Sequence, residues 1–101
     1  MPDGMIDERK VAAARRYFQR HFQALEVYDF EKADRIAQVF RVYHPEFQLD
    51  YTAVLPGEFL NAHDAAEIER LLEHWQTADV MRTAGRHEVV ITEAGPYVAQ
   101  S

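Results

Sequence analysis

The amino-acid sequence predicts an α+β fold with three amphipathic helices and a short β portion. Apolar residues recur at three- and four-residue steps in three segments, which is typical of helices with one buried face. Two other segments alternate with period two or are rich in β-branched residues, as strands are. The 101 residues are 48% apolar, enough to build one core but not two. We therefore expect a single domain over residues 1–101.

The first predicted helix begins after Asp7, a residue type that commonly caps helices. Apolar side chains then recur with helical spacing, and we expect the helix to run from Glu8 to Glu26. Its apolar stripe consists of Val11, Ala14, Phe18, Phe22 and Leu25.

A second helix is predicted from Phe30 to Val42, because Asp29 offers another N-cap and another apolar stripe follows it. Only a few residues separate the two helices, so we expect them to pack side by side as a hairpin. The second stripe consists of Phe30, Ala33, Ile36, Ala37 and Phe40.

A strand is predicted in the middle of the chain. Pro45 ends helical geometry, since the residue before a proline avoids the α region. Residues 47–52 then alternate with period two, as in a strand with one buried face. The dipeptide Pro56-Gly57 is a turn signal, and Phe59-Leu60 is expected to form a short pairing stretch.

The third predicted helix starts at a capping-box pattern formed by Asp64 and Glu67. A buried stripe with helical spacing follows and extends to Trp75. The periodicity then fades over residues 78–85. The stripe consists of Ile68, Leu71, Leu72 and Trp75.

The last part of the chain predicts two strands joined by a turn. Residues 87–92 are rich in β-branched side chains, residues 93–96 form a turn signal, and a further strand begins at Tyr97. A strand at the edge of a sheet leaves backbone groups unpaired unless something covers it. We therefore expect either a homo-oligomer, most simply a homodimer, or a sheet continued by further residues.

Composition narrows the classes of partner. The net charge of -6, from 17 acidic against 11 basic side chains, would repel a phosphate backbone, so we expect no nucleic-acid partner. Cysteine is absent, which excludes disulfides, thiolate nucleophiles and cysteine metal sites and is compatible with a reducing cytoplasm. No run approaches the roughly 18 apolar residues of a membrane span, and the N-terminus lacks a signal-peptide pattern. We expect a cytoplasmic protein that does not enter membranes.

Three segments resemble the SnoaL-like branch of the NTF2-like superfamily: Asp29-Phe30, residues 43–50, and Phe59 through Trp75. The resemblance covers about residues 10–95 and implies a curved antiparallel sheet that wraps around the helices to form a cone-shaped pocket. That family includes polyketide cyclases, ketosteroid isomerase, dehydratases and limonene epoxide hydrolase, and also proteins without catalytic activity. Asn61 stands where the family commonly has glycine. The family's later long strands are missing, so the resemblance implies a truncated version.

The resemblance implies that Asp50 is a general base and that Tyr17 is a hydroxyl donor. A base that removes a proton next to a carbonyl needs a partly desolvated carboxylate, together with a donor that stabilises the enolate. Alternation also allows another interpretation. It places Asp50 on one face of the strand together with Gln48 and Thr52. The other face carries the apolar residues Phe47, Leu49 and Tyr51. If this apolar face packs on the helices, Asp50 faces solvent.

Two functions follow from these residues. In the first, the domain binds a small hydrophobic molecule and, if it is an enzyme, catalyses an isomerase or cyclase reaction on it. In the second, the domain is a non-enzymatic, homo-oligomerising interaction module that uses an exposed β edge and an apolar sheet face. The five histidines contain no i,i+4 pair, so neither a metal nor another cofactor is expected. The predicted ligand-binding residues, which could equally be core, are Phe18, Phe22, Phe40, Tyr43, Phe59 and Trp75.

Overall fold

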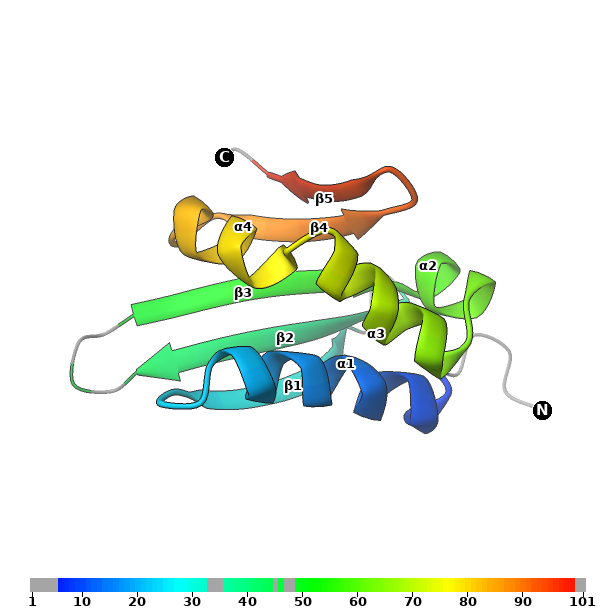
Figure 1. The fold of residues 1–101 in the computed structure, drawn as a ribbon, viewed down its shortest axis with the longest axis horizontal. Coiled ribbons are helices and arrows are strands. Elements are labelled where there is room, and N and C mark those ends of the chain that lie inside the picture. Colours follow the sequence, from blue (N-terminus) through cyan, green and yellow to red (C-terminus); the bar gives the residue numbers. More distant parts are fainter. Residues whose placement is uncertain (1–5, 33–35, 45, 47–48, 100–101) are drawn as a thin grey trace.

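The computed structural model describes residues 6–32, 36–44, 46 and 49–99 (Figure 1). Helices and strands do not alternate regularly along the chain. One helix precedes three strands, three short helices follow, and two strands complete the described part. The elements are α1 (Glu8–His21), β1 (Glu26–Lys32), β2 (Ala37–His44), β3 (Leu49–Pro56), α2 (Gly57–Ala62), α3 (Ala65–His74), α4 (Thr77–Ala84), β4 (Glu88–Thr92) and β5 (Gly95–Val98).

The five strands form one open sheet in the order β1-β2-β3-β4-β5. The first three strands are an antiparallel meander, β4 runs parallel to β3, and β5 returns antiparallel to β4. A parallel neighbour needs a long crossover connection, which α2, α3 and α4 supply between β3 and β4. The α+β class and the mostly antiparallel sheet are therefore confirmed.

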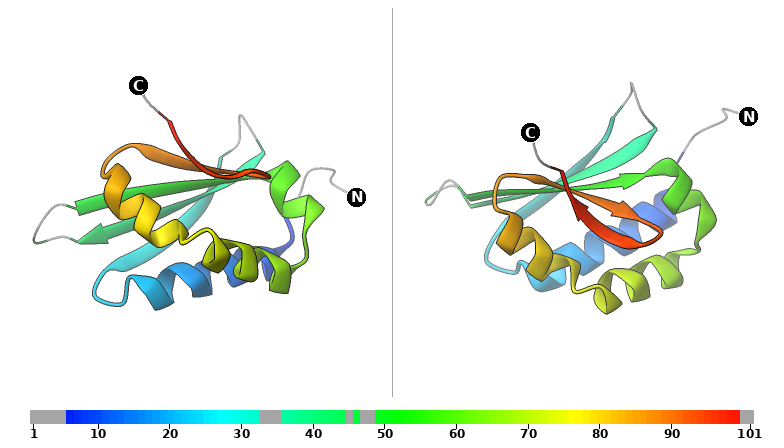
Figure 2. Two further views of the ribbon diagram at one scale, coloured as in Figure 1. Left: turned by 45° about the horizontal axis from the view of Figure 1, so that its top comes forward. Right: turned by 90° about the horizontal axis from the view of Figure 1, so that it is seen from above.

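One face of the sheet carries the main core. Figure 2 shows α1, α3 and α4 on the same side of the strands. Phe18 of α1 packs on Phe40 of β2 with ring centroids 5.0 Å apart, and Ile68 and Leu72 of α3 are fully buried beside them. Burying a side chain of this size contributes about 1.5–3 kcal/mol relative to leaving it exposed, so this layer contact is the main source of stability.

The start of the first predicted helix and the whole of the third are confirmed. The Asp7 carboxylate accepts from the Arg9 N–H at 2.9 Å, and the Asp64 carboxylate accepts from the Glu67 N–H at 2.8 Å. The predicted end of the first helix is wrong, because α1 stops at His21. Phe22 closes it by donating its N–H to the Phe18 carbonyl, and the chain enters β1 within the predicted helix.

The predicted second helix, Phe30–Val42, is wrong: residues 30–32 lie in β1, Ile36 lies in a turn, and residues 37–42 lie in β2. Residues 33–35, with Ala33 of the predicted stripe, lie outside the described residues. The aromatic and β-branched residues of these strands favour extended backbone, and pairing with β3 places Phe40 and Val42 fully in the core. Asp29 does not cap a helix. Its carboxylate accepts hydrogen bonds from Arg15 of α1 and Gln38 of β2, which fastens the helix to the sheet.

Three further elements differ from the prediction. Residues 47 and 48 of the predicted strand lie outside the described residues, and β3 continues to Pro56. Phe59 and Leu60 are buried in the short helix α2 and do not pair as a strand. The aperiodic stretch after residue 77 is the helix α4, which Gln76 separates from α3 by adopting a left-handed conformation with φ of 51°.

The two last strands are confirmed as β4 and β5, although β5 begins at Gly95, inside the predicted turn, and not at Tyr97. Strand β5 lies at a sheet edge as expected. None of the helices in the described part of the chain is long and apolar enough to cross a membrane.

Candidate functional site: the open face of the sheet

The two faces of the sheet have different surroundings. Side chains alternate between the faces along each strand and share a face with their cross-strand partners. Val27, Phe40, Leu55 and Val89 belong to the core beneath the helices. The opposite face, which we call the open face, has no helix packed on it in Figure 2. Its members include Tyr28, Phe30, Lys32, Val39, Arg41, Tyr43, Asp50, Thr52, Val54, Glu88, Val90 and Tyr97.

The open face gathers the exposed apolar surface of the described residues. Tyr28, Phe30 and Tyr97 lie on it with exposed fractions of 49%, 44% and 60%, and Ile36 lies at its end with 52%. These are the four large hydrophobic side chains that stand exposed in the described ranges. Tyr28 and Phe30 lie on β1 and Tyr97 on β5, so these side chains border the open face at its two opposite edges and do not form one contiguous patch.

The same face also has its own small apolar cluster, separate from the main core. Ala37, Val39 and Val54 are buried in it, and Val90 packs against them. No further layer of secondary structure covers this cluster in the described part of the chain. The sheet therefore carries an apolar cluster on each face, and the described helices cover only one of them.

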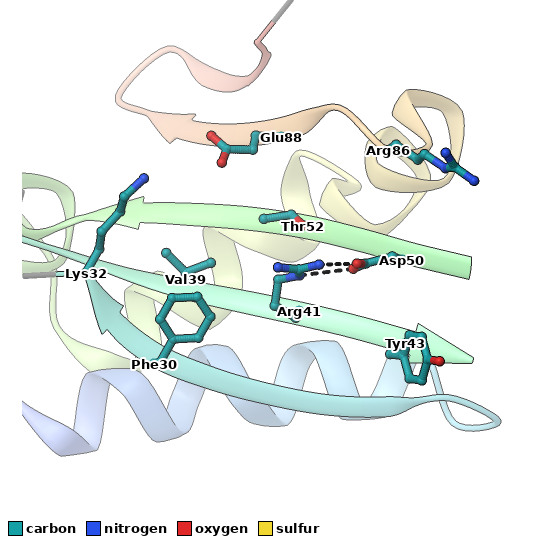
Figure 3. Close-up of a pocket in the computed structure, with 9 residues that line it drawn as sticks. All are labelled: Phe30, Lys32, Val39, Arg41, Tyr43, Asp50, Thr52, Arg86 and Glu88. Atoms are coloured by element: carbon teal, nitrogen blue, oxygen red, sulfur yellow. Dashed lines mark hydrogen bonds and ion pairs between the residues drawn. The ribbon is translucent and has the colours of Figure 1, made fainter. Parts of the chain in front are cut away.

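A groove of about 640 Å³ crosses the open face. Figure 3 shows its side chains projecting from the same side of β1, β2, β3 and β4. Phe30, Val39 and Tyr43 supply apolar and aromatic walls, whereas Arg41 and Asp50 form an ion pair at its centre. The groove is lined by Phe30, Lys32, Val39, Arg41, Tyr43, Asp50, Thr52, Arg86 and Glu88.

The Arg41–Asp50 pair is bidentate. Arg41 Nε donates to Asp50 Oδ1 at 3.0 Å, and a guanidinium nitrogen donates to Asp50 Oδ2. The bond to Asp50 raises the pKa of Arg41 above its ordinary value, so the guanidinium keeps its charge. Because both side chains are partly exposed, we assign the pair at most about 1 kcal/mol of stability. Its role in the groove is to provide a fixed polar centre.

Asp50 and Tyr17, the two predicted catalytic residues, lie on opposite faces of the sheet. Asp50 and Thr52 both line the groove on the open face, whereas Tyr51 between them packs against the main core. This is the orientation of Asp50 that the alternation of the strand predicts. Tyr17 lies in the core between α1 and α4, where its hydroxyl accepts the Ala78 N–H at 2.9 Å. Burial raises the pKa of Tyr17. The structure does not bring these two groups together.

The predicted ligand-binding aromatics are also divided between the faces. Tyr43 lines the groove and pairs across strands with Asp50. Trp75 is partly buried against the main core and contacts Phe59 with centroids 6.0 Å apart. The remaining residues are fully packed beneath the helices: Phe18, Phe22, Phe40 and Phe59.

Sequence reasoning missed Phe30 and Arg41 as groove residues because both fall within the incorrectly predicted second helix. The period-two alternation of residues 26–32, in which Val27 faces the core and Tyr28 and Phe30 face outward, is the signal that could have found Phe30. Arg41 lies in β2, whose burial does not alternate, and reaches the groove through pairing with Tyr28 and Thr52.

A second cluster of titratable groups lies at the corner between α2 and α3. His63 Nδ1 is 2.8 Å from Glu67 Oε1 of α3, and Nε2 is 2.9 Å from Glu93 Oε1 in the β4–β5 turn. The imidazole is only 16% exposed and packs on the Phe59 ring. Burial opposes protonation, but the carboxylates of Glu93 and Glu67 outweigh it, so the pKa of His63 is raised. We call this arrangement the His63 clasp.

Neither cluster forms a metal centre: in the described ranges, no three His, Asp or Glu side chains are grouped as metal ligands. The open face therefore offers an ionic pair surrounded by apolar and aromatic side chains.

Comparison of the chain with protein-family models, curated proteins and solved structures gives no match.

The His63 clasp predicts a pH-dependent stability. A raised folded-state pKa stabilises the fold below the unfolded pKa of about 6.5, and this contribution is lost as pH rises through the raised value. The melting temperature of wild type should therefore fall across that interval relative to His63→Gln. Thermal denaturation between pH 6 and about 9 measures the difference.

The matched control is His74→Gln, which removes an exposed imidazole from α3 without touching either carboxylate. This variant should keep the wild-type pH profile. Parallel profiles for wild type and His63→Gln would show that the clasp does not hold a proton.

Proposed function

We propose that this chain is a non-enzymatic, homo-oligomerising interaction module in which a second copy covers the open face of the sheet. The observation that carries the proposal is the concentration of large exposed hydrophobic side chains on that face. We further propose that it acts in the cytoplasm, in keeping with a chain that has no cysteine.

Layer packing supports this function. An amphipathic sheet is stable when each apolar face is covered by another layer. The helices cover one face, and the other face carries the apolar cluster of Ala37, Val39 and Val54. Two sheets pack face to face about 10 Å apart with interdigitating side chains. A second copy presents the same face, so the contact is self-complementary around a two-fold axis.

Charge favours this face as the contact between copies. The chain carries a net charge of -6, so two copies repel each other through most of their surface. The groove differs, because Lys32, Arg41 and Arg86 outnumber Asp50 and Glu88 among its lining residues. Two copies that meet groove to groove therefore do not bring together surfaces with an excess of acidic groups.

The available area is consistent with a stable contact. From strand spacing and rise, the face of a five-stranded sheet of this length covers about 600 Å² per copy, or roughly 1,200 Å² for two copies. That total lies at the lower limit of specific protein–protein interfaces. Apolar contacts at the centre of the face are thus needed for stable association.

A charge placed on the open face should disrupt the assembly. Tyr97→Glu puts a carboxylate on β5 where the wild type exposes an aromatic ring, and burying it against another copy is unfavourable. We expect the variant to have half the wild-type mass by light scattering at the same concentration, with an unchanged far-UV circular dichroism spectrum.

Gln19→Glu makes the same change in net charge on the exposed side of α1 and should keep the wild-type mass. Equal masses for wild type and Tyr97→Glu would remove the open face as the contact between copies.

The groove favours a second candidate function, an NTF2-like domain that binds a small hydrophobic molecule. Its volume of about 640 Å³ lies within the roughly 300–1,000 Å³ of small-molecule sites. Aromatic walls with a few fixed polar groups suit such ligands, and the family resemblance points the same way. In an isomerase or cyclase reaction, Asp50 would act as the base and Tyr43, its cross-strand partner, as the hydroxyl donor.

The second candidate predicts that one class among steroids, aromatic polyketides and terpenoids raises the melting temperature of wild type. Asp50→Asn should weaken this shift while lowering the stability of the free protein by less than about 1 kcal/mol. Asp79→Asn is the matched control, because Asp79 pairs with Arg82 on α4, away from the groove. Identical ligand shifts in the two variants, or no shift with any class, would rule out the groove as the ligand site.

A further inference from the structure

The outer edge of β1 is open to pairing. This strand ends the sheet, so within the described residues no strand pairs with its outer side. Edge strands carry a row of unpaired backbone groups that favours addition of another strand. The opposite edge, β5, has four residues and includes Pro96, two features that discourage pairing. In contrast, β1 has seven residues and no proline.

The sequence of β1 is complementary to itself when it runs antiparallel. Taken as Glu-Val-Tyr-Asp-Phe-Glu-Lys, the strand has opposite charges at its ends and aromatic residues on both sides of Asp29. We propose that two copies pair through β1 in an antiparallel register centred on Asp29. This register places Glu26 of each copy opposite Lys32 of the other, and Tyr28 opposite Phe30.

All four of these side chains lie on the open face. Tyr28 and Phe30 are both about half exposed in the single chain, and each gains an aromatic cross-strand neighbour. Glu26 and Lys32 have no ion pair within the described part of the chain, and each gains one. Aromatic and opposite-charge cross-strand pairs stabilise a sheet. Because the contact is two-fold symmetric, every such pair forms twice.

The charges also select the register. A shift of two residues in one direction places Glu26 opposite Phe30, and a shift in the other direction places Lys32 opposite Tyr28. Either shift keeps the faces of the strand but loses both charge pairs. A shift of one residue turns the apolar side chains to the wrong face. The Asp29-centred register alone satisfies both the charges and the aromatic residues.

Asp29 itself meets its own copy at the centre of the ladder, where like charges would oppose pairing. Its carboxylate is already neutralised within each chain. Arg15 donates to it through two nitrogens at 2.7 and 3.1 Å, and Gln38 donates at 2.7 Å. These partners hold the carboxylate under α1, largely buried. At the centre of the paired strands, two Asp29 carboxylates therefore meet that are each already ion-paired with Arg15 of their own chain.

Edge pairing joins two five-stranded sheets into one continuous sheet with both open faces on the same side. Its two-fold axis is perpendicular to the sheet, whereas the axis of face-to-face packing lies in the sheet plane. Where these two perpendicular axes intersect, the two contacts together generate a closed tetramer. The edge contact does not rest on the proposed use of the open face, and either contact can exist alone.

Charge reversal tests the register. Glu26→Lys and Lys32→Glu each replace two attractive pairs with two repulsive ones, so each should weaken self-association about tenfold or more. The double variant Glu26→Lys/Lys32→Glu restores both pairs with reversed polarity and keeps the wild-type net charge. We expect its concentration-dependent mass by light scattering to return to that of wild type.

Glu31→Lys controls for the change in charge, because in this register Glu31 lies opposite Val27 and loses no ionic partner. It should assemble as wild type does. The register is overturned if either single variant keeps the wild-type mass, if the double variant fails to recover it, or if wild type is monomeric.

Amide hydrogen exchange of wild-type β1, measured over a range of protein concentrations, gives a second test that needs no variant. Pairing should slow the exchange of the amides on the outer edge of β1 as concentration rises, and unchanged exchange would contradict the pairing.

The edge and face contacts are distinguished by Tyr97→Glu. Glu26→Lys reports on the edge contact, because Glu26 does not line the groove whereas Lys32 does. If both contacts exist, wild type is a tetramer and Tyr97→Glu leaves a dimer that Glu26→Lys then dissociates. If the face contact fails, wild type is already a dimer that is insensitive to Tyr97→Glu but still sensitive to Glu26→Lys. If the edge contact fails, Glu26→Lys leaves the mass unchanged.

Discussion

The structure depends on one constraint: the side chains of a five-stranded sheet alternate between two faces, and the helices that the structure describes cover only one of them. Phe40 and Val42 of β2 pack against α1 on the covered face, whereas Val39 and Arg41 point to the other side. The position of every candidate functional residue follows from this division. Groups that face the helices maintain the fold, and groups on the open face are available to a partner.

Polar contacts fasten the helices and the last hairpin to the sheet at particular points. Arg15 of α1 holds Asp29 of β1, and the His63 clasp joins the start of α3 to the β4–β5 turn. The Trp75 ring lies against the same turn, close to Gly95. These contacts fix the two outer strands, whose exposed aromatic residues border the open face. The rigidity of the edges therefore supports the surfaces that we propose for assembly.

The sequence predicted the elements whose signals are local. The Asp7 and Asp64 caps and the outward position of Asp50 could be read from neighbouring residues, since capping and alternation depend on short spacings. The stretch after Asp29 was predicted wrongly because its apolar residues also fit a helical stripe; the alternation of β1 is a weak local signal, and β2 becomes a strand through its pairing with β1 and β3. Likewise, the separation of Tyr17 from Asp50 depends on which face α1 covers, a tertiary property that no local spacing encodes.

The most direct test of the open face as the interaction surface is hydroxyl-radical footprinting of the full chain over a range of protein concentrations. Oxidation of Tyr28, Phe30 and Tyr97 should fall together as the measured mass rises, while that of His74, exposed on α3 on the helix side, stays constant. A rise in mass with unchanged oxidation of the three aromatic residues, or with protection of His74 instead, would contradict the assignment of function to the open face.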